Sequence, residues 1–293
     1  MKPTSFRYAA PASASEALRL LAQHGEDARA LAGGQSLVPM MNFRLLAPGL
    51  VIDLNRVEGW STIELKEGAL AIGAMTRQSA IEDSELVARH CPLLAEAVKS
   101  VAHRQIRNRG TIGGSLALAY PGAELPAVVL TLGGTILARS LAAERRIPAP
   151  DFFKGALDTA LRPDELIAAV RVPLLPASAA SAFVEIARRH GDFALAGAAI
   201  VLELGRDGAI AAARIGVTGA TPIPMRAAAA EASLAGRRLE GAAFAAAADA
   251  AAAEVDVLGD PQYPVEYRRS LVAAVVKRGL ALATARAGLT RVH

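Results

Sequence analysis

Apolar and polar residues over the first 56 positions alternate between the spacing of helices and that of buried strands. Ser13 and Glu16 fit a capping box that opens an amphipathic helix, and Gly25 is expected to end this helix. The elements that follow are expected at 28–32 (strand), 37–46 (helix) and 50–54 (strand). This alternation of strand and helix favours a small parallel sheet.

The pattern becomes mixed after position 56 and changes again near Leu174. Strands are expected at 70–74, 135–139 and 166–172, and helices at 92–102 and 124–132. The stretch 174–180 has the composition of a linker. Beyond it we expect three antiparallel strands at 183–189, 194–204 and 210–217, with a hairpin turn at 205–208, and then helices at 225–234, 241–255 and 264–287. The pattern thus predicts an α+β chain with domains at 1–174 (subdomains of about 1–56 and 57–174) and 181–293.

Composition excludes several classes of function. The 293 residues are 53% hydrophobic and 20% charged, which is typical of a folded core. The net charge is +4 and no dense basic block is present, so no nucleic-acid partner is expected. The N-terminus lacks a signal peptide's apolar segment, and acidic residues interrupt the alanine-rich stretch 241–257. We therefore expect a cytoplasmic protein without membrane insertion. Cys91, the single cysteine, is interpreted as a packed thiol and cannot hold an iron–sulfur cluster alone.

Two glycine pairs carry the strongest chemical signal. Residues 32–36 read Ala-Gly-Gly-Gln-Ser, and residues 111–115 read Thr-Ile-Gly-Gly-Ser. Paired glycines permit positive φ and the close approach of a ligand, and successive backbone N–H groups can converge on an anion. Two such loops facing each other would hold the diphosphate of a dinucleotide. Neither matches the Rossmann fingerprint or the P-loop. Each is alternatively only a tight turn, as is expected for Gly133-Gly134.

The surroundings of the glycine pairs resemble a known family. The segments that carry the resemblance are 32–41 with 52–54, 105–117, 121–126, 189–194 and 266–269. Through them nearly the whole chain resembles the FAD-binding medium subunit of molybdenum hydroxylases, the xanthine dehydrogenase and aerobic carbon monoxide dehydrogenase family. The resemblance implies a vanillyl-alcohol-oxidase-like FAD-binding domain of two α/β subdomains. A C-terminal domain with a three-stranded antiparallel sheet and a helical bundle would follow it.

The resemblance also implies a function and partners. The chain would carry FAD in a heterotrimer with an iron–sulfur small subunit and a molybdopterin large subunit. It would take electrons from the [2Fe–2S] clusters and pass them to NAD, dioxygen or a quinone. The molybdopterin and the clusters are expected on partner subunits only. We expect no catalytic acid–base residue and no metal ligand in this chain, because the flavin supplies the chemistry.

Site residues are carried over from the family by position. The FAD contacts that the resemblance implies are Ala32, Gly33, Gly34, Gln35, Ser36, Val101, Thr111, Ile112, Gly113, Gly114, Ser115, Glu124, Asp192 and Phe193. The two glycine segments would hold the diphosphate, Glu124 stands where the family usually has an aspartate, and Phe193 would cover one face of the flavin ring. His103 is a weaker candidate.

Two residues depart from the family pattern. Tyr120 stands where relatives often have an aspartate, and Glu185 lies near a position where many carry a lysine that helps to bind the cofactor. These departures put the strength of FAD binding in question. They leave two alternatives open: a self-contained flavin oxidase of the same superfold, and a non-enzymatic assembly scaffold that has lost flavin.

Overall fold

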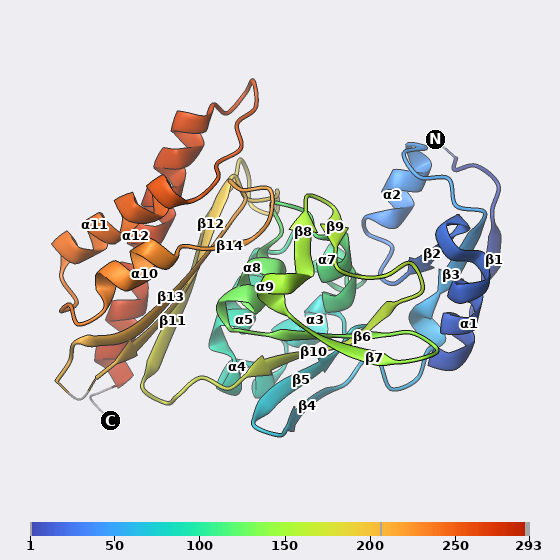
Figure 1. The fold of residues 1–293 in the computed structure, drawn as a ribbon, viewed down its shortest axis with the longest axis horizontal. Coiled ribbons are helices and arrows are strands. Elements are labelled where there is room, and N and C mark those ends of the chain that lie inside the picture. The colour runs from blue at the N-terminus through green and yellow to red at the C-terminus, as the bar shows by residue number, and fades with distance from the viewer. Residues whose placement is uncertain (1, 206, 291–293) are drawn as a thin grey trace.

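Three larger β-sheets follow one another along the long axis of the computed structural model, which describes residues 2–205 and 207–290 (Figure 1). The N-terminal sheet has the order β1-β3-β2, and both pairings are parallel. Its elements are β1 (Arg7–Ala9), α1 (Ala14–His24), β2 (Ala28–Leu31), α2 (Leu37–Asn42) and β3 (Leu50–Asp53), with 3₁₀ turns at Gly25–Asp27 and Leu54–Arg56. The predicted parallel sheet is confirmed.

Local signals explain the ends of these helices. The Ser13 hydroxyl accepts a hydrogen bond from the backbone N–H of Glu16 at 3.2 Å, which opens α1 as predicted. Helix α2 ends four residues before the expected position. Arg44 has a φ of +59°, a left-handed conformation that a helix cannot continue through.

The middle sheet has five antiparallel strands in the order β4-β5-β10-β6-β7. Its strands are β4 (Ile63–Lys66), β5 (Ala69–Gly73), β6 (Thr135–Arg139), β7 (Glu144–Pro148) and β10 (Leu166–Pro173). The helices of this part are α3 (Gln78–Glu82), α4 (Glu85–His90), α5 (Pro92–Ser100), α6 (Arg104–Arg107), α7 (Ile112–Leu118), α8 (Glu124–Thr131) and α9 (Ala149–Phe152), and β8 (Phe153–Gly155) pairs with β9 (Asp158–Thr159). Gly133, with a φ of +68°, makes the expected tight turn before β6.

The C-terminal sheet has four strands, one more than predicted. Its order is β11-β12-β13-β14, and all pairings are antiparallel. The elements are β11 (Ala179–Ile186), β12 (Ala196–Leu204), β13 (Ile210–Thr218), β14 (Met225–Arg226), α10 (Ala228–Leu234), α11 (Gly241–Glu254) and α12 (Val265–Thr290). Met225 was expected to begin a helix, but it pairs with Val217 and forms a fourth strand. Strand β11 begins inside the expected linker. Arg206 of the predicted hairpin turn and residues 291–293 lie outside the described residues.

The C-terminal sheet is covered on both faces. Phe183, Ala199 and Val201 point into the core that α5 and α8 share with the middle sheet. Ala182 and Ile200, one position out of phase, pack into a second core with α10, α11 and α12. This alternation follows from the period of two along a strand. The sheet therefore docks directly onto the helices of the middle part.

Two expectations from composition can be compared with the structure. Cys91 is 2% exposed at the start of α5, and burial raises the pKa of its thiol to about 11, so the interpretation as a packed thiol is confirmed. Within residues 2–205 and 207–290, none of the helices has both the length and the apolar character needed to cross a bilayer.

Candidate functional site

The two glycine segments meet in space, as the diphosphate hypothesis requires. A Cβ placed on Gly33 would lie 2.1 Å from the carbonyl oxygen of Arg109 and 2.8 Å from the Cα of Gly110. A Cβ placed on Gly114 would lie 3.7 Å from the Cβ of Ala32. Gly33 therefore lacks a side chain because the backbone before the second segment passes against it.

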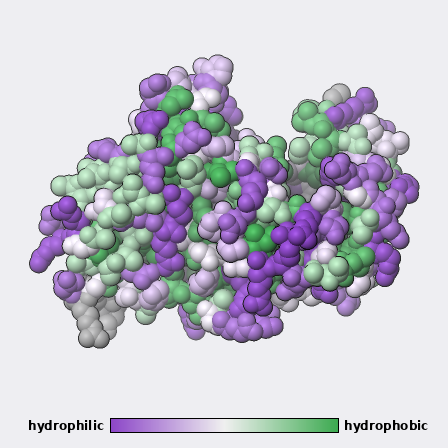
Figure 2. All heavy atoms as spheres, in the orientation of Figure 1, coloured by the Kyte–Doolittle hydropathy of each residue, from purple (hydrophilic) through white to green (hydrophobic). Residues whose placement is uncertain are grey.

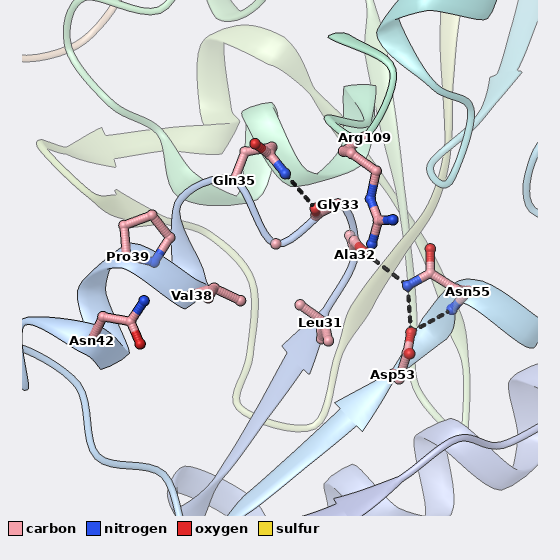
Figure 3. A pocket seen from close by; sticks show the side chains of 11 residues that line it. Leu31, Ala32, Gly33, Gln35, Val38, Pro39, Asn42, Asp53, Asn55 and Arg109 are labelled. Carbon is pink, nitrogen blue, oxygen red and sulfur yellow. Dashed lines mark hydrogen bonds between the residues drawn. The ribbon is translucent and has the colours of Figure 1, made fainter. Parts of the chain in front are cut away.

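The first glycine segment leaves its backbone N–H groups unpaired. It connects β2 to α2, and Gly34 adopts a φ of +75°. Among the described residues, no acceptor pairs with the N–H groups of Gly33, Gly34, Gln35 or Ser36. The Gln35 side chain turns back and donates to the Gly33 carbonyl at 3.1 Å (Figure 3). Four successive free donors of this kind are able to bind an anion.

The second glycine segment uses its N–H groups inside the protein. Thr111 is the N-cap of α7, and its hydroxyl oxygen accepts a hydrogen bond from Gly114 at 3.0 Å. The N–H groups of Ile112 and Gly113 donate to backbone carbonyls of the segment 74–76. The expectation of free donors therefore holds for the first segment and is wrong for these three groups. The second segment supports the first from behind, because the chain that leads into it contacts Gly33.

A cavity of about 510 Å³ opens beside the first segment (Figure 3). Figure 2 shows the surface hollowed between α2 and the middle part of the molecule. The lining residues come from β2, α2, the carboxyl end of β3 and the chain before α7; they are Leu31, Ala32, Gly33, Gly34, Gln35, Val38, Pro39, Asn42, Asp53, Asn55 and Arg109. The wall combines free N–H donors, amide groups, a guanidinium and the Asp53 carboxylate.

Two arginines give the neighbourhood of this cavity a positive charge. Arg109 lines it, and Arg77 lies behind it, donating to the Arg109 carbonyl and, at 2.5 Å, to the Asn55 side chain. Burial, together with the charge of Arg109, lowers the pKa of the Arg77 guanidinium. Burial raises the pKa of Asp53, but hydrogen bonds from Tyr8 and Asn55 outweigh it and leave this pKa below its ordinary value. The paired Asp53 thus remains ionised beside two cations.

A second cavity, of about 670 Å³, lies where the middle part meets the C-terminal domain. Asp192 and Phe193 line it, so these two predicted residues lie apart from the first cavity. Phe193 is 53% exposed, and its ring lies 4.1 Å from the Tyr120 ring, centroid to centroid. Arg188 pairs with Asp192 at 3.5 Å. An exposed aromatic pair on a cavity wall offers a stacking surface for a planar ring.

The remaining predicted residues line neither of these two cavities. Val101 is partly buried, and its carbonyl accepts a hydrogen bond from Arg107 at 2.8 Å. Glu124 is 3% exposed at the first position of α8. His103 packs its ring against Gly191, where a Cβ would lie 2.6 Å from the imidazole. Of these three residues, His103 contacts the loop of the second cavity, through Gly191.

Asn55 and Arg109 of the first cavity, and Arg77 behind it, were not among the predicted site residues. Asn55 donates to the Ala32 carbonyl at 3.0 Å and so ties the first segment to the end of β3. Arg77 and Arg109 supply the charge. A signal for Asn55 exists in the sequence, because it directly follows a strand of a parallel sheet, and ligands bind at the carboxyl ends of such strands.

Comparisons with known proteins cover the whole chain. Residues 4–175 match the family model described as the FAD binding domain in molybdopterin dehydrogenase, and residues 181–283 match that of the CO dehydrogenase flavoprotein C-terminal domain. The chain is 43% identical over 291 residues to the 6-hydroxypseudooxynicotine dehydrogenase complex subunit alpha of Paenarthrobacter nicotinovorans, covering 99% of this chain and 98% of that protein. It is 37% identical to the carbon monoxide dehydrogenase medium chain of Hydrogenophaga pseudoflava over 98% of this chain and 99% of the relative. A solved carbon monoxide dehydrogenase structure from Hydrogenophaga pseudoflava superimposes with a TM-score of 0.94 at 39% identity, covering 98% of this chain and 99% of that one.

Proposed function

The chain belongs to the FAD-binding medium subunits of molybdenum hydroxylase complexes, the family of the carbon monoxide dehydrogenase medium chains, and we propose that it carries electrons from iron–sulfur clusters on a partner subunit to an external acceptor. Its relatives are subunits of dehydrogenases and oxidoreductases, and it is an oxidoreductase subunit like them. The proposed partners are an iron–sulfur small subunit and a molybdopterin large subunit. NAD, dioxygen and a quinone are the candidate acceptors.

The free N–H groups of the first glycine segment are the observation that carries this proposal. A diphosphate is an anion with many acceptor oxygens, and four unpaired donors beside Arg109 match it in charge and in hydrogen bonding. Residues 32–36 would hold the diphosphate, and residues 111–115 would fix the position of that loop. When bound, FAD supplies the capacity to accept electrons singly and to release them in pairs.

Helix α7 relates the two cavities to each other. Its N-terminal residues support the first glycine segment, and Tyr120 on the wall of the second cavity lies just beyond its C-terminus. Seven helical residues span about 10 Å, a distance that an extended dinucleotide can bridge. In this arrangement Phe193 and Tyr120 would shield the flavin ring, with Asp192 at its edge. Val101 and Glu124 would be further contacts to FAD, although neither side chain lines this cavity.

We also propose the domain limits 1–174 and 181–293, with subdomains of about 1–56 and 57–174. The separate sheets support this division. One hydrophobic cluster, packed between the C-terminal sheet and the helices of the second domain, contains residues of that domain alone. A parallel sheet beside a larger antiparallel sheet, with the glycine segments between them, supports a vanillyl-alcohol-oxidase-like arrangement of the FAD-binding domain.

The visible spectrum of the purified chain tests the proposed function. We expect a flavin absorption band that small substrates alone do not bleach and that is bleached once the iron–sulfur and molybdopterin subunits are added with substrate. Bleaching by a small substrate without those subunits would instead identify a self-contained oxidase. A colourless chain that takes up no added FAD would identify a scaffold.

The charge of the first cavity gives a separate prediction. Arg109→Met is expected to raise the Kd for FAD by roughly tenfold, because one charge-assisted hydrogen bond contributes about 1.5 kcal/mol. Titration of flavin-free protein with FAD, followed by fluorescence, measures the change. Arg146→Met removes an exposed arginine from β7 and should leave the Kd unchanged. Equal dissociation constants for the two variants would remove Arg109 from the site.

A further inference from the structure

The loop between β11 and β12, residues 187–195, carries Asp192 and Phe193 on the wall of the second cavity. Gly191 of this loop has a φ of +87°. A Cβ placed on Gly191 would lie 2.6 Å from Cε1, 2.9 Å from Nδ1 and 3.0 Å from Nε2 of His103. Because these three ring atoms are almost equally distant, the face of the imidazole covers Gly191. A side chain at position 191 would occupy the space that the ring fills.

The His103 side chain acts on this loop and not on its own helix. His103 is the N-cap residue of α6, but its side chain makes no capping hydrogen bond. Its backbone carbonyl accepts hydrogen bonds from the N–H groups of Ile106 and Arg107 at 2.9 Å and 3.1 Å. Within residues 2–205 and 207–290, the imidazole takes part in no hydrogen bond or ion pair. Its ring contacts Gly191 and lies 5.9 Å from the ring of His190, centroid to centroid, and both of these residues belong to the loop.

The backbone that presents His103 is held firmly in place. The buried guanidinium of Arg107 donates to the carbonyls of Val101 at 2.8 Å and Ala102 at 3.2 Å. The same guanidinium donates to the Glu82 carboxylate of α3 at 2.8 Å. These bonds fix the segment that leads into α6 against α3. The imidazole is therefore a rigid support for the loop that packs on it.

The polar contacts of the loop leave its position to packing. The backbone N–H of Ala194 donates to the Gly122 carbonyl of the middle part at 3.3 Å, which is a long hydrogen bond. The ion pair between Arg188 and Asp192, at 3.5 Å, lies within the loop and joins two exposed side chains. An ion pair of this kind contributes little to stability. The contact with His103 is therefore what fixes the loop against the middle part.

We propose that His103 is a positioning residue: the face of its imidazole supports Gly191 and thereby determines where the loop places Phe193 beside Tyr120. Phe193 follows Gly191 by two positions, and its ring lies 4.1 Å from the Tyr120 ring, centroid to centroid. Without the imidazole, Gly191 regains the wide backbone freedom of a glycine, and Phe193 moves away from Tyr120. The effect on the loop is a property of this chain alone. The effect on a flavin ring rests on the proposed function.

Hydrogen exchange of the full, flavin-free chain, followed by mass spectrometry, tests the support of the loop. His103→Ala is expected to speed the exchange of the amides at 187–195 roughly tenfold, which is equivalent to about 1.4 kcal/mol. His103→Phe keeps a flat ring at this position and should restore the slow exchange. His90→Ala, on α4, removes a histidine that lines neither of the two cavities and should behave like the wild type. Unchanged exchange in His103→Ala, with the helix content of the wild type, would overturn the proposal.

The fluorescence of bound flavin tests the consequence for the site. An aromatic ring stacked on a flavin quenches its fluorescence, so the FAD-loaded His103→Ala variant is expected to lose part of this quenching. His103→Phe should regain it, and His90→Ala should keep it. Faster loop exchange without a change in fluorescence would support the role of His103 and place the flavin away from Phe193, so that the proposed FAD arrangement alone fails. No change in either measurement would refute the role of His103.

Discussion

Gly33→Ala is expected to abolish the retention of FAD while leaving the helix content almost unchanged. The new Cβ would lie 2.1 Å from the Arg109 carbonyl oxygen and 2.8 Å from the Gly110 Cα, and neither backbone atom can rotate away. The two segments must therefore separate by about 1 Å or more to reach normal contact distances. The free N–H groups are then displaced from the position in which they would bind the FAD diphosphate. Losing two hydrogen bonds to a charged diphosphate weakens the affinity roughly a hundredfold or more.

The control for this change is Gly241→Ala. Gly241 is the first residue of α11, has an ordinary φ, and has open space where the Cβ would be placed. The flavin-to-protein ratio after gel filtration and the far-ultraviolet circular dichroism should both equal those of the wild type. Full flavin occupancy in Gly33→Ala would show that the close contact between the segments is not needed for binding.

The second large effect is expected for Arg107→Met, with a loss of about 3 kcal/mol in the free energy of unfolding. Arg107 is 7% exposed, and its guanidinium donates to the Glu82 carboxylate at 2.8 Å and to the Val101 carbonyl at 2.8 Å. It thereby holds the turn at Ala102, whose φ is +45°. Without it, the Glu82 carboxylate keeps only the ion pair with the more exposed Arg104, and the carbonyls of Val101 and Ala102 lose their donor.

Arg104→Met is the matched control, because Arg104 binds the same Glu82 carboxylate from a side chain that is 44% exposed. An exposed ion pair contributes about 0.2–1 kcal/mol, so this variant should unfold close to the wild type. Chemical denaturation at neutral pH measures both variants. Equal losses would mean that burial of Arg107 adds nothing to its ion pair.

Elements with strong local signals could be predicted from the sequence, and elements defined by their partners could not. Ser13 with Glu16 caps the start of α1, and the apolar run at 28–32 forms β2. Both could be predicted because each signal comes from residues that are close together in the sequence. Strand β7 is mostly exposed at a sheet edge and lacks an alternating pattern. Strand β14 is two residues long and exists only because β13 offers it a partner.

In the candidate site, too, features that depend on distant partners could not be predicted from the sequence. That the two glycine segments meet followed from their shared pattern, and the structure bears this out. That the N–H groups of Ile112 and Gly113 are paired depends on carbonyls at 74–76, which approach the second segment from another strand end. Two glycines also lower helix propensity, which hid the start of α7 at Thr111. The contribution of Arg77 is likewise tertiary, since it reaches the site from a distant loop.

The carboxylate of Glu96 joins three elements that are far apart in the chain. It accepts hydrogen bonds from Arg286 of α12 at 2.7 Å and from the backbone N–H of Phe183 on β11 at 3.0 Å, while it sits on α5 itself. The ion pair spans 190 positions, so its formation must offset a large loop-closure entropy. During synthesis, the ion pair between Glu96 and Arg286 can link the sheet to α5 only after Arg286 has left the ribosome. Residues 1–285 have by then been synthesised, so this link between the C-terminal sheet and α5 forms after the elements that it joins.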